Sequence, residues 1–139
     1  MIDRCNSSNK NKIISVSENR RTFKINNKSL LTINKVIVDN CYIKDTKRCD
    51  YLFEIIDDCD VKSVFYVELK GMDIQKAILQ LEATLKYCLP IHKQSNRSCY
   101  IVASRVPKAS TSTQKFKKKF KRKYNISLYI NTKLKEVTL

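Results

Sequence analysis

Alternating apolar and polar positions predict two neighbouring strands in the middle of the chain, over residues 50–56 and 63–70. Successive side chains of a strand point to opposite faces, so Glu68 and Lys70 share one face of the second strand. Asp50 opens the first strand. If the two strands pair as a hairpin, Asp50, Glu68 and Lys70 meet at one end of it.

Helical spacing of apolar residues follows the second strand. Asp73 is suited to N-cap a helix that continues to about residue 88 and is stopped by Pro90. The apolar stripe of this helix consists of Ile74, Ala77, Ile78, Leu81, Leu85 and Cys88. A buried type of apolar run then predicts a strand over 99–106. The order strand, helix, strand predicts a right-handed crossover and a parallel strand pair at the centre of the sheet.

The flanking regions have less regular patterns. Residues 1–12 are polar and aperiodic, which predicts a flexible arm. Residues 13–33 contain apolar positions without a clean period, compatible with short strands, a short helix or both. A run of β-branched residues predicts a strand over 35–43, and final strands are expected over 126–130 and, at a sheet edge, over 135–139.

Length and composition fit one domain, which we place at 13–139 with its core over 35–106. The formal net charge of +15 favours a polyanionic partner, most simply nucleic acid, with an anionic membrane surface as the second option. No apolar run approaches the roughly 20 residues that cross a bilayer, and the N-terminus lacks the apolar core of a signal peptide. We therefore expect no membrane span and an intracellular, cytoplasmic location.

Cysteine, histidine and glycine usage argues against several classes of site. The six cysteines contain no CxxC pair and several fall on predicted apolar faces, so we expect reduced structural thiols. His92 is the only histidine, which argues against a Cys2His2 zinc site and an HNH-type nuclease centre. Gly71 is the only glycine, so the chain has neither a P-loop nor a GxGxxG fingerprint.

A strongly basic segment, residues 114–124, places Phe116, Phe120 and Tyr124 four positions apart and predicts an amphipathic helix lying on the domain. Its basic residues are Lys115, Lys117, Lys118, Lys119, Lys121, Arg122 and Lys123. We expect them to contact nucleic-acid phosphates, which gives affinity without sequence readout. A solvated face or a membrane surface is the alternative. The same surface is expected to include Lys47, Arg48, Arg97 and Arg105.

One stretch carries a recognisable order of residues. Asp50, seventeen intervening residues, then Glu68-Leu69-Lys70 on a strand, a glycine, and an amphipathic helix containing Gln80 resemble the PD-(D/E)xK nuclease superfamily. The resemblance covers about residues 35–106. It implies an α/β, restriction-endonuclease-like fold, in which helices flank a central mixed β-sheet.

The resemblance also implies roles for these residues. Asp50, Glu68 and the main-chain carbonyl of Leu69 are the implied ligands of Mg²⁺ or Mn²⁺. Lys70 is implied to orient the attacking water or to stabilise charge on the phosphate, and Gln80 to support the catalytic site. The alternative is that Glu68 and Lys70 form a surface pair on a solvated hairpin and that Gln80 faces solvent.

The chain departs from the family pattern at two points. Cys49 stands where the motif has proline. Glu18 is the candidate for the acidic residue that many members carry on a first helix, although no such helix is clear here. Asp39, on the neighbouring strand, either points toward the site or lies at the surface.

These observations together predict a divalent-metal-dependent nuclease that hydrolyses phosphodiester bonds, with DNA favoured over RNA. One alternative is a catalytically silent, basic nucleic-acid-binding module of the same fold that acts within a complex. A structural protein that coats RNA is a third interpretation. A homodimer and a partner chain are both compatible with the sequence.

Overall fold

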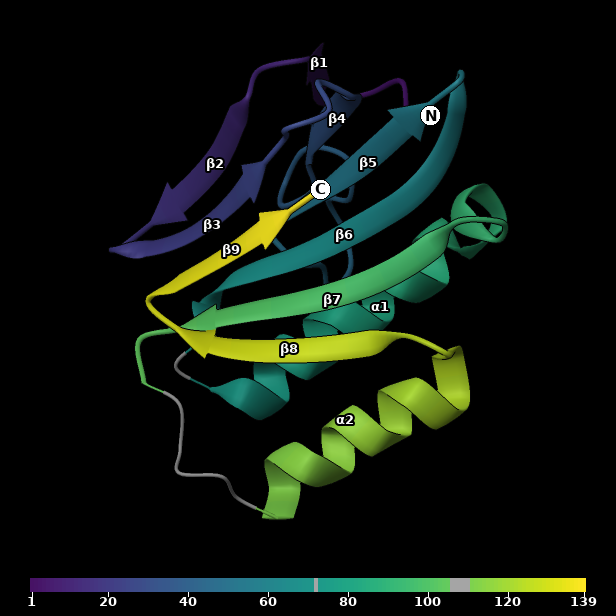
Figure 1. Cartoon of the computed structure of the whole chain (residues 1–139). Helices are drawn as coiled ribbons and strands as arrows, with labels where there is room; N and C mark the ends of the chain where they lie inside the picture. The colour runs from purple at the N-terminus through teal and green to yellow at the C-terminus, as the bar shows by residue number, and fades with distance from the viewer. Residues whose placement is uncertain (72, 106–110) are drawn as a thin grey trace.

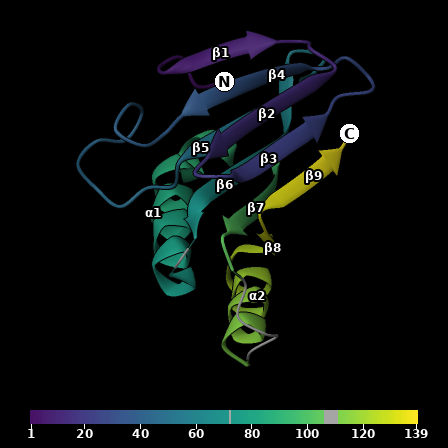
Figure 2. The ribbon, with the colours of Figure 1, turned by 90° about the vertical axis from the view of Figure 1, so that its left-hand side faces the viewer.

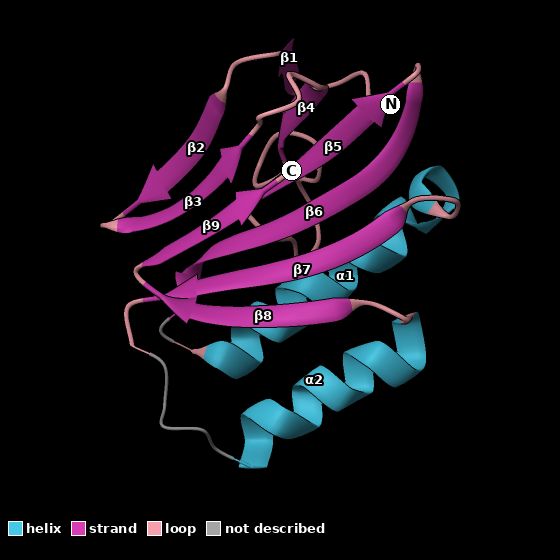
Figure 3. Ribbon diagram, viewed as in Figure 1, coloured by secondary structure: helices cyan, strands magenta, loops and turns pink. Residues whose placement is uncertain are grey.

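The computed structural model describes residues 1–71, 73–105 and 111–139, and for residues 70, 71, 111 and 112 it describes the backbone alone. The described residues form nine strands and two helices (Figures 1 and 3). The strands are β1 (Asn6–Asn9), β2 (Ile13–Glu18), β3 (Arg21–Asn26), β4 (Thr32–Ile37), β5 (Tyr51–Asp57), β6 (Asp60–Gly71), β7 (Asn96–Ala103), β8 (Ser127–Thr132) and β9 (Leu134–Thr138). The helices are α1 (Ile74–His92) and α2 (Thr111–Tyr124).

The main sheet has six strands in the order β1-β4-β5-β6-β7-β8. Strands β1, β4, β5 and β6 pair antiparallel, whereas β6, β7 and β8 pair parallel. The parallel pair predicted for the two strands around α1 is therefore confirmed, but the central pair of the sheet is the antiparallel pair of β5 and β6. The coarser prediction, an α/β chain built on a central mixed sheet, is confirmed with it.

The two faces of the main sheet are covered by different kinds of layer. Both helices lie on one face, while β2, β3 and β9 form a small second sheet on the other (Figures 1 and 2). Along β6, Val64 and Tyr66 pack into the core that contains the helices, whereas Phe65 and Val67 pack into the core that contains the second sheet. Helices were expected to flank the sheet. The second sheet takes the place of a helical layer on one face.

Helix α1 follows the predicted pattern at its start and differs at its end. Asp73 is the N-cap, and its side chain accepts a hydrogen bond from the Lys76 amide at 3.1 Å. The prediction that Pro90 ends the helix is wrong, because the helix continues through Pro90 to His92. His92 is fully buried and hydrogen-bonded to the main sheet, so tertiary contacts hold the final turn despite the amide that proline lacks.

The N-terminal segment differs from the flexible arm that its polarity suggested. Residues Asn6–Asn9 form β1 on the edge of the main sheet, and Ile2 is 3% exposed. Cys5 and Cys41 form a disulfide, so the expectation of reduced thiols is wrong for these two; the other four cysteines are free. Backbone pairing and a covalent bond order this segment, and neither depends on apolar periodicity.

The uncertain region 13–33 forms a β-hairpin followed by a further strand. β2 and β3 pair antiparallel through a turn in which Asn19 and Arg20 both have positive φ, the geometry of a tight hairpin turn. β4 ends at Ile37, six residues before the expected boundary at 43, because residues 38–43 turn back with Ile43 bonded to the Val38 carbonyl.

In the described part of the chain, no helix is long and apolar enough to cross a membrane.

Candidate functional site

Several structural elements meet at one end of the main sheet: the start of β5, the carboxyl ends of β6 and β7, and the start of α1. In open sheets with parallel strands, ligands bind outside the carboxyl ends of those strands. The register between β6 and β7 shifts between Glu68 and Gly71, which are paired with Ile101 and Ala103. Such irregularities redirect side chains and are common next to functional sites.

Asp50 is buried and held by main-chain contacts at this end. Its side chain is 3% exposed, its amide donates to the Val67 carbonyl at 3.1 Å, and its Oδ2 accepts from the Leu69 amide at 2.7 Å. The Val38 amide donates to the Asp50 carbonyl at 3.0 Å. Asp50 is therefore fixed by β6 on one side and by the residue that follows β4 on the other.

Glu68 is fully buried on β6, next to the segment that carries Asp50. The ladder between β5 and β6 ends at the pair of Tyr51 and Val67, and the Asp50 amide donates to the Val67 carbonyl, so Asp50 itself lies just outside the ladder. By strand alternation Glu68 shares the helix-facing side of β6 with Tyr66. The two predicted acids thus lie at the same end of the sheet, and their burial argues against a solvated hairpin face.

The thiol next to this pair is held in its neutral form. Cys49 is fully buried, and its pKa is raised well above its ordinary value, chiefly by burial and further by the charges of Glu68 and Asp50, although the Thr84 contact opposes the shift. The Cys49 amide donates to Thr84 Oγ1 of α1 at 2.8 Å. The position that carries proline in the nuclease motif therefore anchors the start of β5 to the helix.

The two remaining residues of the motif, Leu69 and Lys70, differ in how much of each the structure describes. The Leu69 side chain is fully buried in the core under the second sheet, while its amide contacts Asp50. Lys70 belongs to β6, but its side chain lies outside the described residues, so its predicted catalytic role stays a prediction. Of the three residues that the sequence predicted to converge, the structure therefore describes the side chains of Asp50 and Glu68 but not that of Lys70.

Gln80 is partly buried on α1, and its Nε2 donates to the Arg48 carbonyl at 3.2 Å. Arg48 in turn pairs with Asp39, at 2.8 Å between Nε and Oδ1, and donates to the carbonyls of Lys44 and Thr46. The structure therefore assigns Gln80 to holding the loop before Asp50, and Asp39 to an ion pair with that loop. Lys47 and Lys76 line a cavity of about 220 Å³ beside Gln80 and Arg48.

Glu18 lies at the end of β2 in the second sheet, opposite Arg21. The first helix that would have carried it is replaced by strands, so the expected position of this acid is not met. Arg21 extends from the same hairpin to Ser104, just after β7, with 3.2 Å between Nη1 and Oγ.

Helix α2 presents the predicted aromatic stripe and basic face. Phe120 is fully buried, and Phe116 and Tyr124 pack against the same core. Of the seven basic residues, Lys117 is half-buried and the others are exposed. Lys119 lies 3.3 Å from Glu82 of α1, whose other carboxylate oxygen accepts from the Tyr124 hydroxyl at 2.7 Å. Lys119 is thus part of the α1–α2 contact, and Lys123 lies over the Tyr124 ring, 5.3 Å from its centroid.

A buried polar network that the sequence analysis did not assign lies on the same face of β5 and β6. Glu54 Oε2 is 2.7 Å from His92 Nε2, and His92 Nδ1 is 2.6 Å from the Tyr66 hydroxyl. Glu54 Oε1 accepts from the Ile2 amide at 2.9 Å and from Asn34 Nδ2 at 2.7 Å. Glu54 lies four residues after Asp50, so strand alternation places both on the same face, and this signal could have identified Glu54 from the sequence. The network joins four elements, β4, β5, β6 and α1, to the N-terminal segment.

Two kinds of side-chain donor lie at this end of the sheet, the carboxylates of Asp50 and Glu68 and the thiol of Cys49. Within residues 1–71, 73–105 and 111–139, no three His, Cys, Asp or Glu side chains come together as a metal-binding group. Comparison with protein-family models, with curated proteins and with solved structures found no match to this chain.

Proposed function

We propose that this protein is a divalent-metal-dependent nuclease that hydrolyses phosphodiester bonds, with DNA as its substrate, and that its core follows the restriction-endonuclease-like fold. The observation that carries the proposal is that two buried acids, Asp50 just before β5 and Glu68 on β6, lie at the carboxyl ends of the parallel strands. The order of elements supports it as well. An antiparallel β4-β5-β6 unit, a helix and a parallel β7 follow one another as the resemblance implies.

The residues present fit a hard cation. Two buried carboxylates attract a cation more strongly than exposed ones do, because charges interact more strongly away from water. Oxygen donors match Mg²⁺ or Mn²⁺. Asp50 and Glu68 would hold the ion, with the Leu69 carbonyl, in the shifted part of the register, as the third ligand. When bound, such an ion neutralises a phosphate oxygen and lowers the pKa of a water molecule.

The chain itself supplies orientation. The Leu69 amide fixes the Asp50 carboxylate, and Thr84 and Gln80 of α1 fix the two residues before it. Lys70 is proposed to orient the attacking water. The start of α1 points its amides toward this end of the sheet, where a helix N-terminus favours a phosphate group. Lys76, in the first turn of α1, adds a positive charge at the same end.

The test replaces each carboxylate by its amide. Asp50→Asn and Glu68→Gln are each expected to lower the rate of Mg²⁺- or Mn²⁺-dependent DNA cleavage by at least about a hundred-fold, since even changes around metal ligands cost 10–100-fold. Wild-type protein should also gain thermal stability with Mn²⁺, and the variants should lose that gain. Asp57→Asn, an exposed acid at the far end of β5, is the matched control. Equal cleavage rates in wild type, variants and control would refute the catalytic proposal.

The second candidate function is a nucleic-acid-binding module without catalysis. It is favoured by the exposed cations of α2, whose contacts to phosphate would not require Asp50 or Glu68. The same experiment separates the two functions. Retained DNA binding with no metal-dependent cleavage and no metal-induced stabilisation in the wild type would favour the binding module.

A further inference from the structure

A second polar cavity lies at the opposite end of the parallel strands. It has a volume of about 320 Å³ and is formed where α1 and α2 end and β7 and β8 begin. Its lining residues are Lys93, Ser95, Asn96, Arg97, Lys121, Tyr124, Asn125 and Ser127. Arg97 pairs with Val64 of β6, four positions before Glu68, so the cavity is roughly 13 Å along the sheet from the carboxylate pair.

The chemistry of this lining suits an oxyanion. Lys93, Arg97 and Lys121 come from three different segments, following α1, on β7 and on α2, and converge on one cavity. None of the described residues that line it is Asp or Glu. The ends of α1 and α2 contribute partial negative charge, but three full positive charges outweigh it. Cations gathered in this way repel one another, and an anion among them removes that repulsion.

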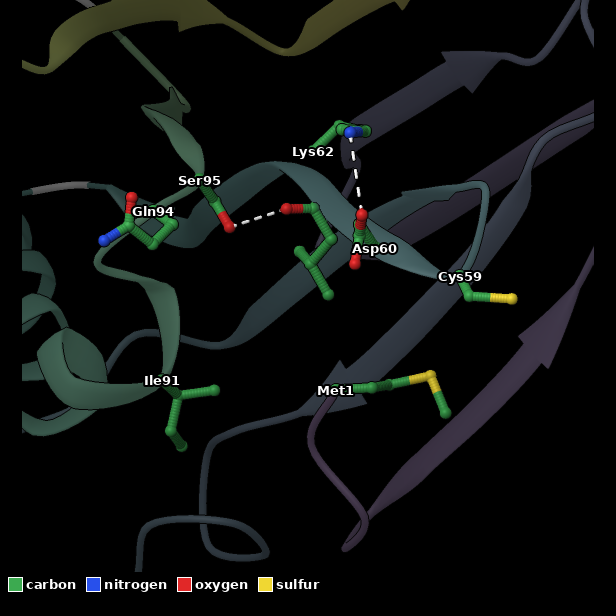
Figure 4. A pocket seen from close by; sticks show the side chains of 8 residues that line it. Met1, Cys59, Asp60, Lys62, Ile91, Gln94 and Ser95 are labelled. Carbon is green, nitrogen blue, oxygen red and sulfur yellow. Dashed lines mark hydrogen bonds and ion pairs between the residues drawn. The ribbon is translucent and has the colours of Figure 1, made fainter.

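A neighbouring cavity at the same end of the sheet gives a useful contrast. It has a volume of about 470 Å³ and shares Ser95, but there Lys62 faces its own partner, with 3.8 Å between Nζ and Asp60 Oδ2 (Figure 4). Ser95 turns its hydroxyl to the Val61 carbonyl in this view. One cation balanced by one acid does not select an anion. The cavity around Arg97 differs from this one in net charge, since its described lining has three cations and no acid.

An apolar cavity adjoins the basic one. It has a volume of about 310 Å³ and is lined by Leu85, Lys86, Leu89, Arg97, Lys123 and Tyr124. Arg97 and Tyr124 are walls of both cavities, and Arg97 Nη2 donates to the Tyr124 carbonyl at 3.4 Å. Aliphatic side chains and an aromatic ring offer surface to a planar base, whereas the three cations around them are unsuited to an acyl chain.

We propose that these adjoining cavities form a nucleotide-binding site, with the phosphate group in the basic half and the base in the apolar half. The ligand is a nucleoside monophosphate or the phosphorylated end of a nucleic-acid strand. The site is separate from the carboxylate pair, and binding to it requires neither a divalent metal nor cleavage. Within the basic face of α2, it gives Lys121 and Lys123 a role that Lys118 does not share.

The test measures binding of adenosine 5′-monophosphate, adenosine and inorganic phosphate to the full chain by calorimetry, without divalent metal. The monophosphate should bind more tightly than either part alone. Lys121→Gln and Arg97→Gln should each weaken its binding about ten-fold or more, because each removes a charge-assisted contact. Lys118→Gln, an exposed change on the same helix, should have little effect.

A second pair of variants tests the apolar half. Leu89→Asn should weaken binding of the monophosphate but not of inorganic phosphate, while Leu79→Asn, a similarly exposed leucine of α1, should change neither. Short DNA strands with and without a 5′-phosphate then distinguish a strand end from a free nucleotide. Equal losses for Lys121→Gln and Lys118→Gln, or equal affinities for the monophosphate and phosphate, would overturn the proposal.

Discussion

At the scale of single residues, the helix-facing side of β5 and β6 carries two kinds of buried acid. Asp50 and Glu68 are buried at the carboxyl end of β6, whereas Glu54 is enclosed by His92, Asn34 and the Ile2 amide. Burial alone would raise the pKa of Glu54, but the hydrogen bonds from His92, Ile2 and Asn34 lower it below its ordinary value. Asp50 and Glu68 are suited to binding a ligand, whereas Glu54 and its partners stabilise the core.

The lowered pKa of Glu54 predicts a loss of stability in acid. A group with a lower pKa in the folded state contributes stability above its unfolded pKa of about 4.3, and that contribution is lost as the pH falls through the folded value. Glu54→Gln should remove this part of the pH dependence, so its unfolding free energy should fall less steeply below about pH 4. Denaturant unfolding across pH 2–6 measures both curves, and superimposable slopes would contradict the assignment.

At the scale of secondary-structure elements, the sequence indicated the centre of the fold better than its periphery. Helices α1 and α2 have strong helical periods, β6 alternates, and β7 is a continuous apolar run, so these elements could be predicted from the sequence. Of the N-terminal strands, β1 is polar throughout, and β2 and β3 alternate over only six residues each. Their order comes from a disulfide, a tight turn without glycine and packing on the second face of the sheet, all of which depend on contacts distant in the chain.

The last turn of α1 illustrates why local rules failed there. Pro90 cannot donate an amide hydrogen bond and costs about 3 kcal/mol in a helix interior, yet the helix continues to His92 because that side chain is bonded to Glu54 and Tyr66. No pattern within the helix reports those partners. Sequence alone therefore placed the helix end too early.

The same feature predicts a stabilising substitution. Pro90→Ala restores the missing amide in the final turn, and after allowance for the more flexible unfolded chain it should raise the unfolding free energy by about 1–2 kcal/mol. Leu79→Ala, a half-exposed change in the same helix, should shift it by less than about 0.5 kcal/mol. Urea denaturation of the three proteins gives the comparison. A destabilised Pro90→Ala protein would mean that the proline itself shapes the turn around His92.

At the scale of the whole molecule, a disulfide and hydrogen bonds between segments distant in sequence add to the packing of the layers. The Cys5–Cys41 disulfide closes a sequence separation of 36 residues and fastens β1 to the loop after β4. The Ile2 amide reaches Glu54 in the interior, so the N-terminal segment is tied covalently and by hydrogen bonding. Disulfides persist in oxidising surroundings and are rare in the cytosol, so the redox potential around the protein determines whether the Cys5–Cys41 bond is formed.

Reduction of this disulfide should destabilise the protein without removing its fold. For a closed loop of this length the chain-entropy relation gives a loss of about 3–4 kcal/mol in unfolding free energy. The double change Cys5→Ser and Cys41→Ser should reproduce the effect of reductant and abolish further sensitivity to it. Cys59→Ser, at an exposed free cysteine, should leave stability unchanged. Hydrogen exchange should show faster exchange at residues 5–9 and at their partners on β4.

The hairpin turn at Asn19 and Arg20 belongs to a wider property of the chain. The described residues with positive φ, Lys133 and Asp58 among them, are all non-glycine. Side chains with a Cβ atom resist this conformation by about 1–2 kcal/mol each, so every such turn stores a small unfavourable energy. Substitutions at these turns can therefore raise the free energy of unfolding. In directed evolution, that added stability would allow the protein to tolerate destabilising substitutions around Asp50 and Glu68.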